Sequence, residues 1–149
     1  MLMICNSYAR AMKFTAYDGV GNPVSLTDAN GNTTQNTYDN ANRLVQITFP
    51  EVQVGGSPGN QGTLQHPVET RGYDKNGNLI EVVNPRGIKT QTAYNSFNKP
   101  TQITKNADAA ANARIVEAMS YDGNGNLVEI TDGNGNKTRY EYDAMNRRT

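Results

Sequence analysis

Acidic and amide side chains recur in this sequence at a spacing that resembles the start of a calcium-binding loop. The pentapeptide DGNGN stands at 122–126 and again at 132–136. An EF-hand loop begins with this alternation, but it also needs Gly at its sixth position and Glu at its twelfth. The sixth positions here are Leu127 and Lys137, and neither copy has Glu at the twelfth. We therefore predict structural turns rather than metal sites, and we predict no cofactor.

The other side chains that could react have no partners in the sequence pattern. His66 is the only histidine, it stands before Pro67, and no G-x-S-x-G or cysteine pattern accompanies it, which argues against a nucleophilic triad. Cys5 is the only cysteine, so an intrachain disulfide is excluded, and we interpret it as a small hydrophobic residue. Paired carboxylates such as Asp18 and Asp28 each open a turn, which favours turn formation over acid–base catalysis. We predict no catalytic residue and no enzymatic activity.

Composition and charge exclude several further classes of protein. The 149 residues include 14 basic and 14 acidic side chains, which gives no electrostatic basis for binding nucleic acid or an anionic membrane. No stretch approaches the ~20 apolar residues of a membrane span, and the first residues lack the basic region of a secretion signal. About one residue in six is Leu, Ile, Val or Phe, which in a neutral chain predicts a folded protein with a thin core.

Short alternating segments separated by glycine and asparagine predict β-strands joined by tight turns. In the first part of the chain these segments are 13–18, 23–28, 33–39 and 44–49. In the pattern D-x-x-G-N between them, the Asp accepts backbone N–H groups as an Asx-turn and the central pair suits a type I turn. The Gly takes the left-handed conformation, which Asn also tolerates. Glycine loops followed by strands do not predict a phosphate-binding site, which needs a helix there. The pattern predicts an all-β meander of hairpins.

The hairpin pattern occurs three times along the chain. In each copy two tyrosines lie 21 residues apart: Tyr17 and Tyr38, Tyr73 and Tyr94, Tyr121 and Tyr142. The predicted organisation is an irregular lead-in at 1–12, a first repeat at 13–50, a Gly/Pro-rich loop at 51–67, a degenerate second repeat at 68–105, a connector at 106–113 and a truncated third repeat at 114–149. Period-two alternation predicts a buried face with Val24, Leu26, Ile80, Val82, Val128 and Ile130, and a solvent face with Ser25, Glu81 and Glu129.

These residues resemble the YD repeat, also called the RHS repeat. Its pattern is roughly Y-D-x-x-G-N, an apolar stretch, T-D-x-x-G-x-x-T-x-Y-x-Y-D-x-x-N-R-L. The third copy, YDGNGNLVEITDGNGNKTRYEYDAMNRR, matches nearly throughout, and the first, YDGVGNPVSLTDANGNTTQNTYDNANRL, is close. The second departs where NPRG replaces the TD-x-x-G turn and YNSFNKP replaces YD-x-x-N-R-L, but it keeps Gly87, Thr90 and Tyr94. The resemblance covers about three quarters of the chain.

The resemblance implies β-hairpins that wind into a spiral and close as a hollow shell. Bacterial members, such as Rhs proteins, the C component of insecticidal Tc toxins and wall-associated proteins, hold a C-terminal toxin inside it. The teneurins of animals use a similar shell for cell adhesion, and some repeats have been associated with carbohydrate binding. The self-cleavage motif DPxG of the bacterial proteins is absent, and the sequence ends inside a repeat. We therefore expect a fragment of a shell wall or a short remnant gene product.

The function that the resemblance implies is a non-enzymatic, structural repeat region in the encapsulating shell of a polymorphic toxin or a related exported protein. Its partners would be neighbouring YD repeats of a larger chain or an encapsulated toxin polypeptide, and it would be secreted or on the cell surface. The alternative is a carbohydrate-binding or adhesion module, which expects exposed tyrosines where the shell expects packed ones. A third, weaker alternative is a hydrolase, which expects a pocket joining His66 to a carboxylate.

The residues expected to carry the repeat are those of its turns and its tyrosines. They are Tyr17, Asp18, Gly21, Asn22, Asp28, Gly31, Tyr38, Asp39, Asn42, Arg43, Tyr73, Asp74, Gly77, Asn78, Gly87, Tyr94, Tyr121, Asp122, Gly125, Asn126, Asp132, Gly135, Tyr142, Asp143, Asn146 and Arg147.

Overall fold

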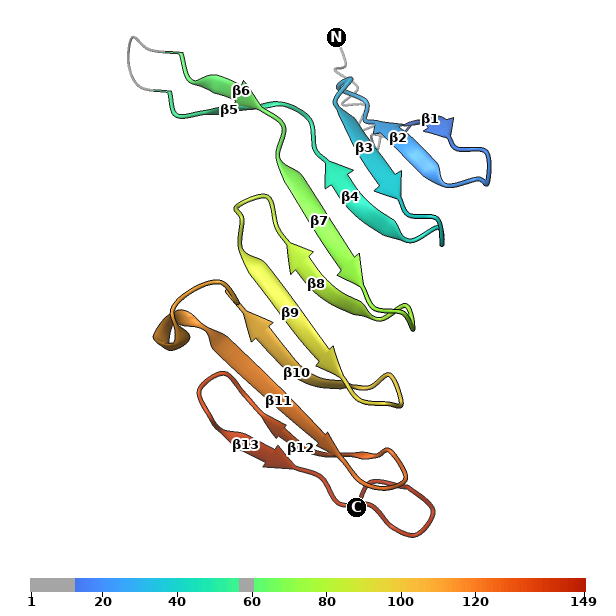
Figure 1. Cartoon of the computed structure of the whole chain (residues 1–149), viewed down its shortest axis with the longest axis vertical. Helices are drawn as coiled ribbons and strands as arrows, with labels where there is room; N and C mark the ends of the chain where they lie inside the picture. The colour runs from blue at the N-terminus through green and yellow to red at the C-terminus, as the bar shows by residue number, and fades with distance from the viewer. Residues whose placement is uncertain (1–12, 57–60) are drawn as a thin grey trace, which may run out of the picture. The chain divides into compact units, whose positions relative to one another are not determined.

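Antiparallel strands make up nearly all of the regular structure. The computed structural model describes residues 13–56 and 61–149, and the chain divides into two units, Met1–Val68 and Glu69–Thr149 (Figure 1). The predicted lead-in at 1–12, with Cys5, lies outside the described residues. The prediction of an all-β meander is confirmed, and each unit can be described by itself.

The first unit contains a four-stranded meander and a separate two-stranded ribbon. Strands β1 (Lys13–Tyr17), β2 (Pro23–Thr27), β3 (Thr33–Tyr38) and β4 (Leu44–Thr48) pair in sequence order. The ribbon pairs β5 (Val52–Val54) with β6 (Thr63–Gln65), inside the segment predicted as a loop. The alternation of VQV and TLQ is short, and the Gly and Pro residues between them hide it from a composition-based prediction.

The second unit is a longer meander with one short helix. Its strands are β7 (Val68–Tyr73), β8 (Leu79–Val83), β9 (Lys89–Tyr94), β10 (Pro100–Lys105), β11 (Ile115–Tyr121), β12 (Leu127–Thr131) and β13 (Lys137–Arg139), again in sequence order. The connector 106–113 contains the 3-10 turn η1 (Ala111–Ala113), in which the Ala113 N–H donates to the Ala110 carbonyl. Alanine favours helical backbone, which suits this turn.

The hairpins that follow five of the tyrosines contain β-bulges: those after Tyr17, Tyr38, Tyr73, Tyr94 and Tyr121. The pairing shifts between Gly72 and Tyr73 in the β7–β8 hairpin, and between Ser120 and Tyr121 in the β11–β12 hairpin. The hairpins at the other ends of the strands, β8–β9 and β12–β13, keep an unbroken register. A bulge inserts an extra residue into one strand and increases its twist. The bulges place each tyrosine opposite the first residue after its turn, for example Tyr121 opposite Leu127.

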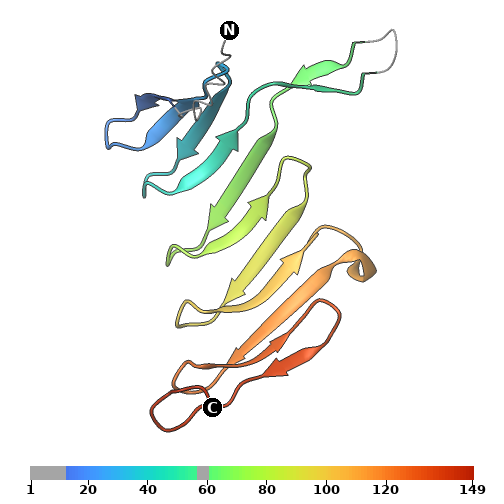
Figure 2. The same cartoon turned by 180° about the vertical axis from the view of Figure 1, so that it is seen from behind.

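The predicted core is not present as an enclosed layer. Among the described residues only Ala107, 8% exposed, is a buried apolar residue. Seen from both sides, the strands of the second unit form a single sheet with no second layer of described residues on either face (Figures 1 and 2). The sheet is therefore held by its backbone ladders and by polar contacts between turns.

The prediction of one buried and one solvent face is wrong for this reason. Ile80, assigned to the buried face, is 37% exposed, whereas Glu81, assigned to solvent, is half-buried. The Glu81 carboxylate lies 3.5 Å from Lys89 Nζ and accepts a hydrogen bond from Gln91 Nε2 at 3.1 Å. Without a covering layer, the aliphatic stems of neighbouring side chains bury polar residues as much as apolar ones.

Candidate functional site

The aspartates that open the turns organise the functional part of each repeat. The Asp122 Oδ1 atom accepts hydrogen bonds from the backbone N–H groups of Asn124 at 3.0 Å and Asn126 at 2.7 Å. Its Oδ2 atom accepts a third, from Asn126 Nδ2 at 2.9 Å. The Gly125 N–H donates to the Asp122 carbonyl at 3.0 Å, and Gly125 has φ of +82°. One carboxylate therefore satisfies three donors of the loop that follows it.

These hydrogen bonds lower the pKa of the turn aspartates below the ordinary value. For Asp122 and Asp132 the largest cause is the side-chain hydrogen bond from the asparagine four residues on, and for Asp39 and Asp143 it is the backbone N–H of the following arginine. Hydrogen bonds to the charged form favour it. A cation that bound here would have to displace these donors, and within the described residues no group of three or more His, Cys, Asp or Glu side chains is placed to hold a metal ion.

Two turns of the second copy use asparagine in place of aspartate. Asn84 Oδ1 accepts the N–H groups of Arg86 and Ile88, at 2.9 and 3.0 Å. Asn95 Oδ1 does the same for Phe97 and Lys99, both at 3.0 Å. These turns keep the backbone geometry, since Gly87 has φ of +76° and Asn98 of +58°. The amide supplies one acceptor oxygen where the carboxylate supplies two. The side chain at the fifth position does not bond back in either turn, because Ile88 has no donor and Lys99 Nζ contacts the Gly125 carbonyl oxygen instead.

Neighbouring turns on the tyrosine side of the sheet are joined by asparagine pairs. Asn78 Nδ2 donates to Asn98 Oδ1 at 2.8 Å, and Asn126 Nδ2 donates to Asn146 Oδ1 at 2.8 Å. In the first unit Asn22 Nδ2 donates to Asn42 Oδ1 at 3.1 Å. In each pair the acceptor is the left-handed asparagine of the turn that lies 20 residues further along the chain. The conformation of the second turn thus aims its side chain at the first.

A lysine extends this row of contacts in the second unit. Lys99 Nζ contacts the Gly125 carbonyl oxygen and lies 5.3 Å from the centre of the Tyr121 ring. It therefore joins the turn at 95–99 to the turn at 122–126, which the asparagine pairs do not link. A cation over an aromatic face is attracted by the ring's quadrupole. The four turns at 74–78, 95–99, 122–126 and 143–147 consequently form one connected row.

The tyrosines at the strand ends reach back across the sheet. Tyr38, Tyr94 and Tyr142 each donate a hydroxyl hydrogen bond to the carbonyl of the residue 15 positions earlier: Pro23 at 3.2 Å, Leu79 at 3.1 Å and Leu127 at 3.0 Å. The Tyr121 hydroxyl donates to the Pro100 carbonyl at 2.8 Å, and partial burial raises its pKa. Each acceptor is the first residue of a strand: Pro23 of β2, Leu79 of β8, Pro100 of β10 and Leu127 of β12. These rings are half-buried, whereas Tyr17 is exposed.

His66 meets a carboxylate on the surface of the first unit. Its Nε2 lies 3.4 Å from Glu51 Oε1, and its Nδ1 is 3.0 Å from the Phe49 carbonyl oxygen. The side chains of His66 and Glu51 are 54% and 52% exposed. A general base for a nucleophile needs a serine, threonine or cysteine within hydrogen-bond reach, and among the described residues the partners of the two ring nitrogens are Glu51 and the Phe49 carbonyl. His66 and Glu51 thus form a surface contact between the two chain segments that lead into and out of the β5–β6 ribbon.

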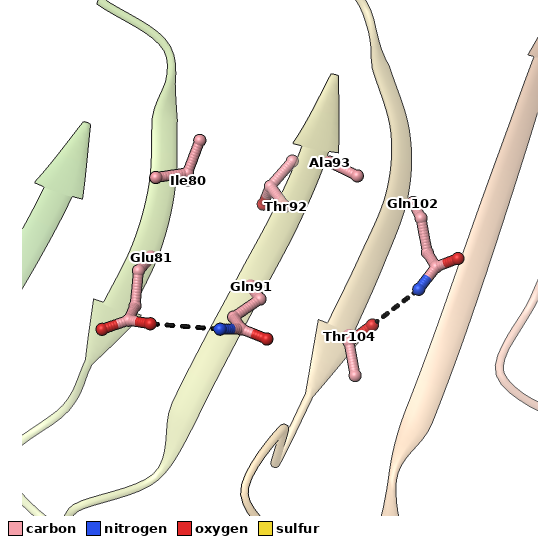
Figure 3. Close-up of a pocket in the computed structure, with 7 residues that line it drawn as sticks. All are labelled: Ile80, Glu81, Gln91, Thr92, Ala93, Gln102 and Thr104. Carbon is pink, nitrogen blue, oxygen red and sulfur yellow. Dashed lines mark hydrogen bonds between the residues drawn. The ribbon is translucent and has the colours of Figure 1, made fainter. Parts of the chain in front are cut away.

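The second unit carries several shallow hollows, of which two are larger than the one beside Lys99 and Asn124. One of about 300 Å³ spans β8, β9 and β10 and is lined by Ile80, Glu81, Gln91, Thr92, Ala93, Gln102 and Thr104 (Figure 3). Its polar groups bond to one another, since Gln91 donates to Glu81 and Gln102 donates to the Thr104 hydroxyl. The other, of about 410 Å³, lies beside Phe97, whose ring is 76% exposed. Neither lining contains a histidine or a cysteine.

The structure places the predicted signature residues in turns and at strand ends, along with groups that sequence reasoning missed. Those missed are the Lys99 bridge, the carbonyl acceptors of the tyrosines and the outer asparagines Asn76 and Asn124, which also donate to Asn98 and Asn146. The spacing of 20 to 22 residues between Asn partners was visible in the sequence. It becomes a signal only once the turns are known to lie side by side.

Comparison with known proteins identifies a family and a fold. The family model described as RHS Repeat matches residues 17–51, 73–110 and 121–149, which is more than half of the chain. No match was found among curated proteins. In the part of the chain that the structure describes, no helix has the length and apolarity needed to cross a membrane.

Solved structures share the fold at low sequence identity. A TcdB2–TccC3–Cdc42 crystal structure matches with a TM-score of 0.69 at 19% identity, covering 90% of this chain and 6% of that one. The Photorhabdus luminescens Tc holotoxin pore with a mutated TccC3 gives a TM-score of 0.68, again at 19% identity and with the same coverage. The chain thus spans a small fraction of the length of these structures. Since the family model covers all three copies of the motif, this chain belongs to the RHS repeat family.

Proposed function

We propose that this chain forms part of the wall of a protein shell that encloses another polypeptide, and that it has no enzymatic activity of its own. The observation that carries the proposal is the RHS repeat match across three copies. The fold shared with structures that contain TccC3 supports it. On this proposal the chain acts as a segment of a larger, exported bacterial protein, and its partners are neighbouring repeats and the enclosed polypeptide.

The geometry of the sheet suits a wall. A wall must resist bending while it presents one face to the cargo and one to the solvent. Here the backbone ladders run along the whole of each meander, and the turn contacts tie adjacent hairpins at their ends. Stability then depends on contacts between neighbours, as in other repeat proteins.

Protease protection in the source bacterium tests the proposal. An antibody against the peptide 121–147 would isolate the native polypeptide for intact-mass measurement and for digestion by an added protease. We expect a polypeptide several times heavier than 16.3 kDa, with an internal segment that is digested only after denaturant opens the shell. A free chain near 16.3 kDa that protects nothing would overturn the proposal.

The carbohydrate-binding alternative expects a flat, exposed tyrosine face. Four of the tyrosines instead use their hydroxyls on backbone carbonyls and are half-buried, so they offer little ring surface for stacking on a sugar. Specific binding to an immobilised glycan, lost on replacing Tyr17, would favour the alternative, since Tyr17 is the exposed member of the set.

A further inference from the structure

Four Asn-Gly dipeptides stand in the turns, and each offers a chemistry that the shell does not use. They are Asn30-Gly31, Asn76-Gly77, Asn124-Gly125 and Asn134-Gly135. The glycine backbone nitrogen can attack the asparagine Cγ atom, so that the Cγ–Nδ2 bond breaks and ammonia leaves. The resulting succinimide is opened by water to aspartate or isoaspartate. Glycine permits this attack because it has no Cβ to obstruct the approach.

Two of these dipeptides lie in identical pentapeptides but in different surroundings. Asn124 Nδ2 donates to Asn146 Oδ1 at 3.1 Å, and the Gly125 carbonyl is contacted by Lys99. Asn134 makes a backbone bond to Asp132 at 2.9 Å, and no side-chain partner of Asn134 is recorded in the described structure. A Cβ built on Gly135 would meet nothing within 4 Å.

We propose that Asn134 is a site of spontaneous deamidation and that the neighbouring turn protects Asn124. In both turns the attacking glycine N–H is held by the aspartate carbonyl, at 3.0 Å for Gly125 and 2.9 Å for Gly135. The requirement to break that bond is therefore the same at both sites. The carboxamide of Asn124 must also leave Asn146 before it can turn toward the glycine nitrogen, whereas the carboxamide of Asn134 is free to do so.

The same difference in side-chain contacts predicts which of the other two asparagines, Asn76 and Asn30, deamidates faster. Asn76 Nδ2 donates to Asn98 Oδ1 at 3.2 Å, so it belongs with Asn124. Asn30 makes a backbone bond to Asp28 at 2.7 Å and has no recorded side-chain bond, so it belongs with Asn134. Isoaspartate would add a methylene group to the backbone of a tight turn, and its carboxylate would stand beside the aspartate that opens the turn. The modification would therefore open the hairpin.

Rates of deamidation in one folded chain test the proposal directly. The full chain would be incubated at mildly alkaline pH and digested with a protease that cuts after glutamate. Cuts after Glu117, Glu129 and Glu141 place Asn124 and Asn134 on separate peptides. Mass spectrometry then follows the replacement of –NH2 by –OH, and fragment ions locate it. We expect Asn134 to react several-fold faster than Asn124. Equal rates, or a faster reaction at Asn124, would overturn the proposal.

Two controls test whether the hydrogen bond from Asn124 to Asn146 causes the difference in deamidation rate. The variant Asn146→Gly removes the acceptor and keeps a residue suited to positive φ, so the rate at Asn124 should rise toward that of Asn134 while the rate at Asn134 stays unchanged. An unchanged rate at Asn124, or an equal rise at both sites, would contradict protection by the hydrogen bond to Asn146. In concentrated urea the deamidation rates at Asn124 and Asn134 should converge, because the two pentapeptides are identical. A difference that persists in urea would be caused by the flanking sequence, and it would overturn the proposal.

Discussion

At the scale of single residues, each turn aspartate performs three bonding tasks at once. Two backbone N–H groups and one side-chain donor converge on the carboxylate of Asp18, and the same arrangement recurs at Asp74 and Asp122. Only a charged group with two acceptor oxygens on a short side chain fits all three donors. This explains why the motif calls for aspartate, since an asparagine supplies a single acceptor oxygen.

The lowered pKa of these aspartates predicts a loss of stability in acid. Their pKa in the folded chain lies below the ordinary 3.8. The stability they add is therefore fully present above that value and is lost as the pH falls through the lower, folded pKa. We expect the urea midpoint to change little above pH 3.8 from this cause and to fall as the pH is lowered further. In Asp122→Asn, which copies the asparagine at positions 84 and 95, the midpoint should be lower at pH 7 and should fall less in acid. An unaltered acid response in this variant would contradict the assignment.

The left-handed backbone conformation in the turns predicts which substitutions of glycine destabilise the chain most. Gly135 has φ of +87°, and the equivalent position in another turn is Asn146, at +60°. Gly135→Ala should lower the free energy of unfolding by about 1–2 kcal/mol, because a Cβ disfavours this conformation, and Gly135→Asn should cost less. The matched control is Gly123→Ala, where φ is not positive and nothing lies within 4 Å. Thermal unfolding of the three variants would measure the order, and an equal cost for Ala at both sites would contradict it.

Turn chemistry could be predicted from single residues, and contacts between turns could not. The D-x-x-G-N pattern predicts the acceptor and the left-handed residue of each turn, because every hydrogen bond within the turn joins residues of the same five-residue segment. The bond from Asn126 to Asn146 joins positions 20 apart, and it depends on the two hairpins lying next to each other in register. Sequence alone fixes neither the neighbour nor the direction of a side chain at positive φ.

At the scale of strands, the bulges add a second reason, beside the missing covering layer, why period-two alternation misplaced the faces. In the β7–β8 hairpin Gly72 pairs with Glu81 and Tyr73 pairs with Leu79, so Ile80 is the extra residue. The extra residue in the β11–β12 hairpin is Val128. Alternation assumes that every residue advances the pleat by one step, which fails at a bulge. The strands themselves were predictable from their turns, but their faces depend on these extra residues.

The tyrosine hydroxyls predict a measurable coupling between strand ends. Tyr142→Phe removes the bond to the Leu127 carbonyl, and it should lower the free energy of unfolding by about 0.5–1.5 kcal/mol. Tyr140→Phe is the control, because the recorded contact of Tyr140 is with Arg148 through its ring, 5.0 Å from the Arg148 Cζ atom. Denaturant titrations of the two variants provide the comparison. An effect of equal size in both would mean that the Tyr142 hydroxyl bond does not stabilise the strand end.

At the scale of the whole molecule, the repeat replaces an enclosed core with repeated local contacts. Leu, Ile and Val side chains are present at regular positions, yet among the described residues only Ala107 is buried. The composition predicted a thin core. Whether a sheet closes or stays open depends on what lies against its faces, and composition and alternation do not reveal that.

The scarcity of buried apolar surface predicts an unusually small heat capacity change on unfolding. Exposure of apolar surface raises the heat capacity, and a globular protein of this length would show a change of about 2 kcal/mol/K. Since the apolar side chains here are already half exposed in the folded state, we expect scanning calorimetry of the isolated chain to give a clearly smaller value. The measurement should be repeated over a range of concentrations, because association of exposed strands would bury further surface and raise it. A value near 2 kcal/mol/K that does not change with concentration would show that a single chain buries a full core, and it would contradict the open sheet.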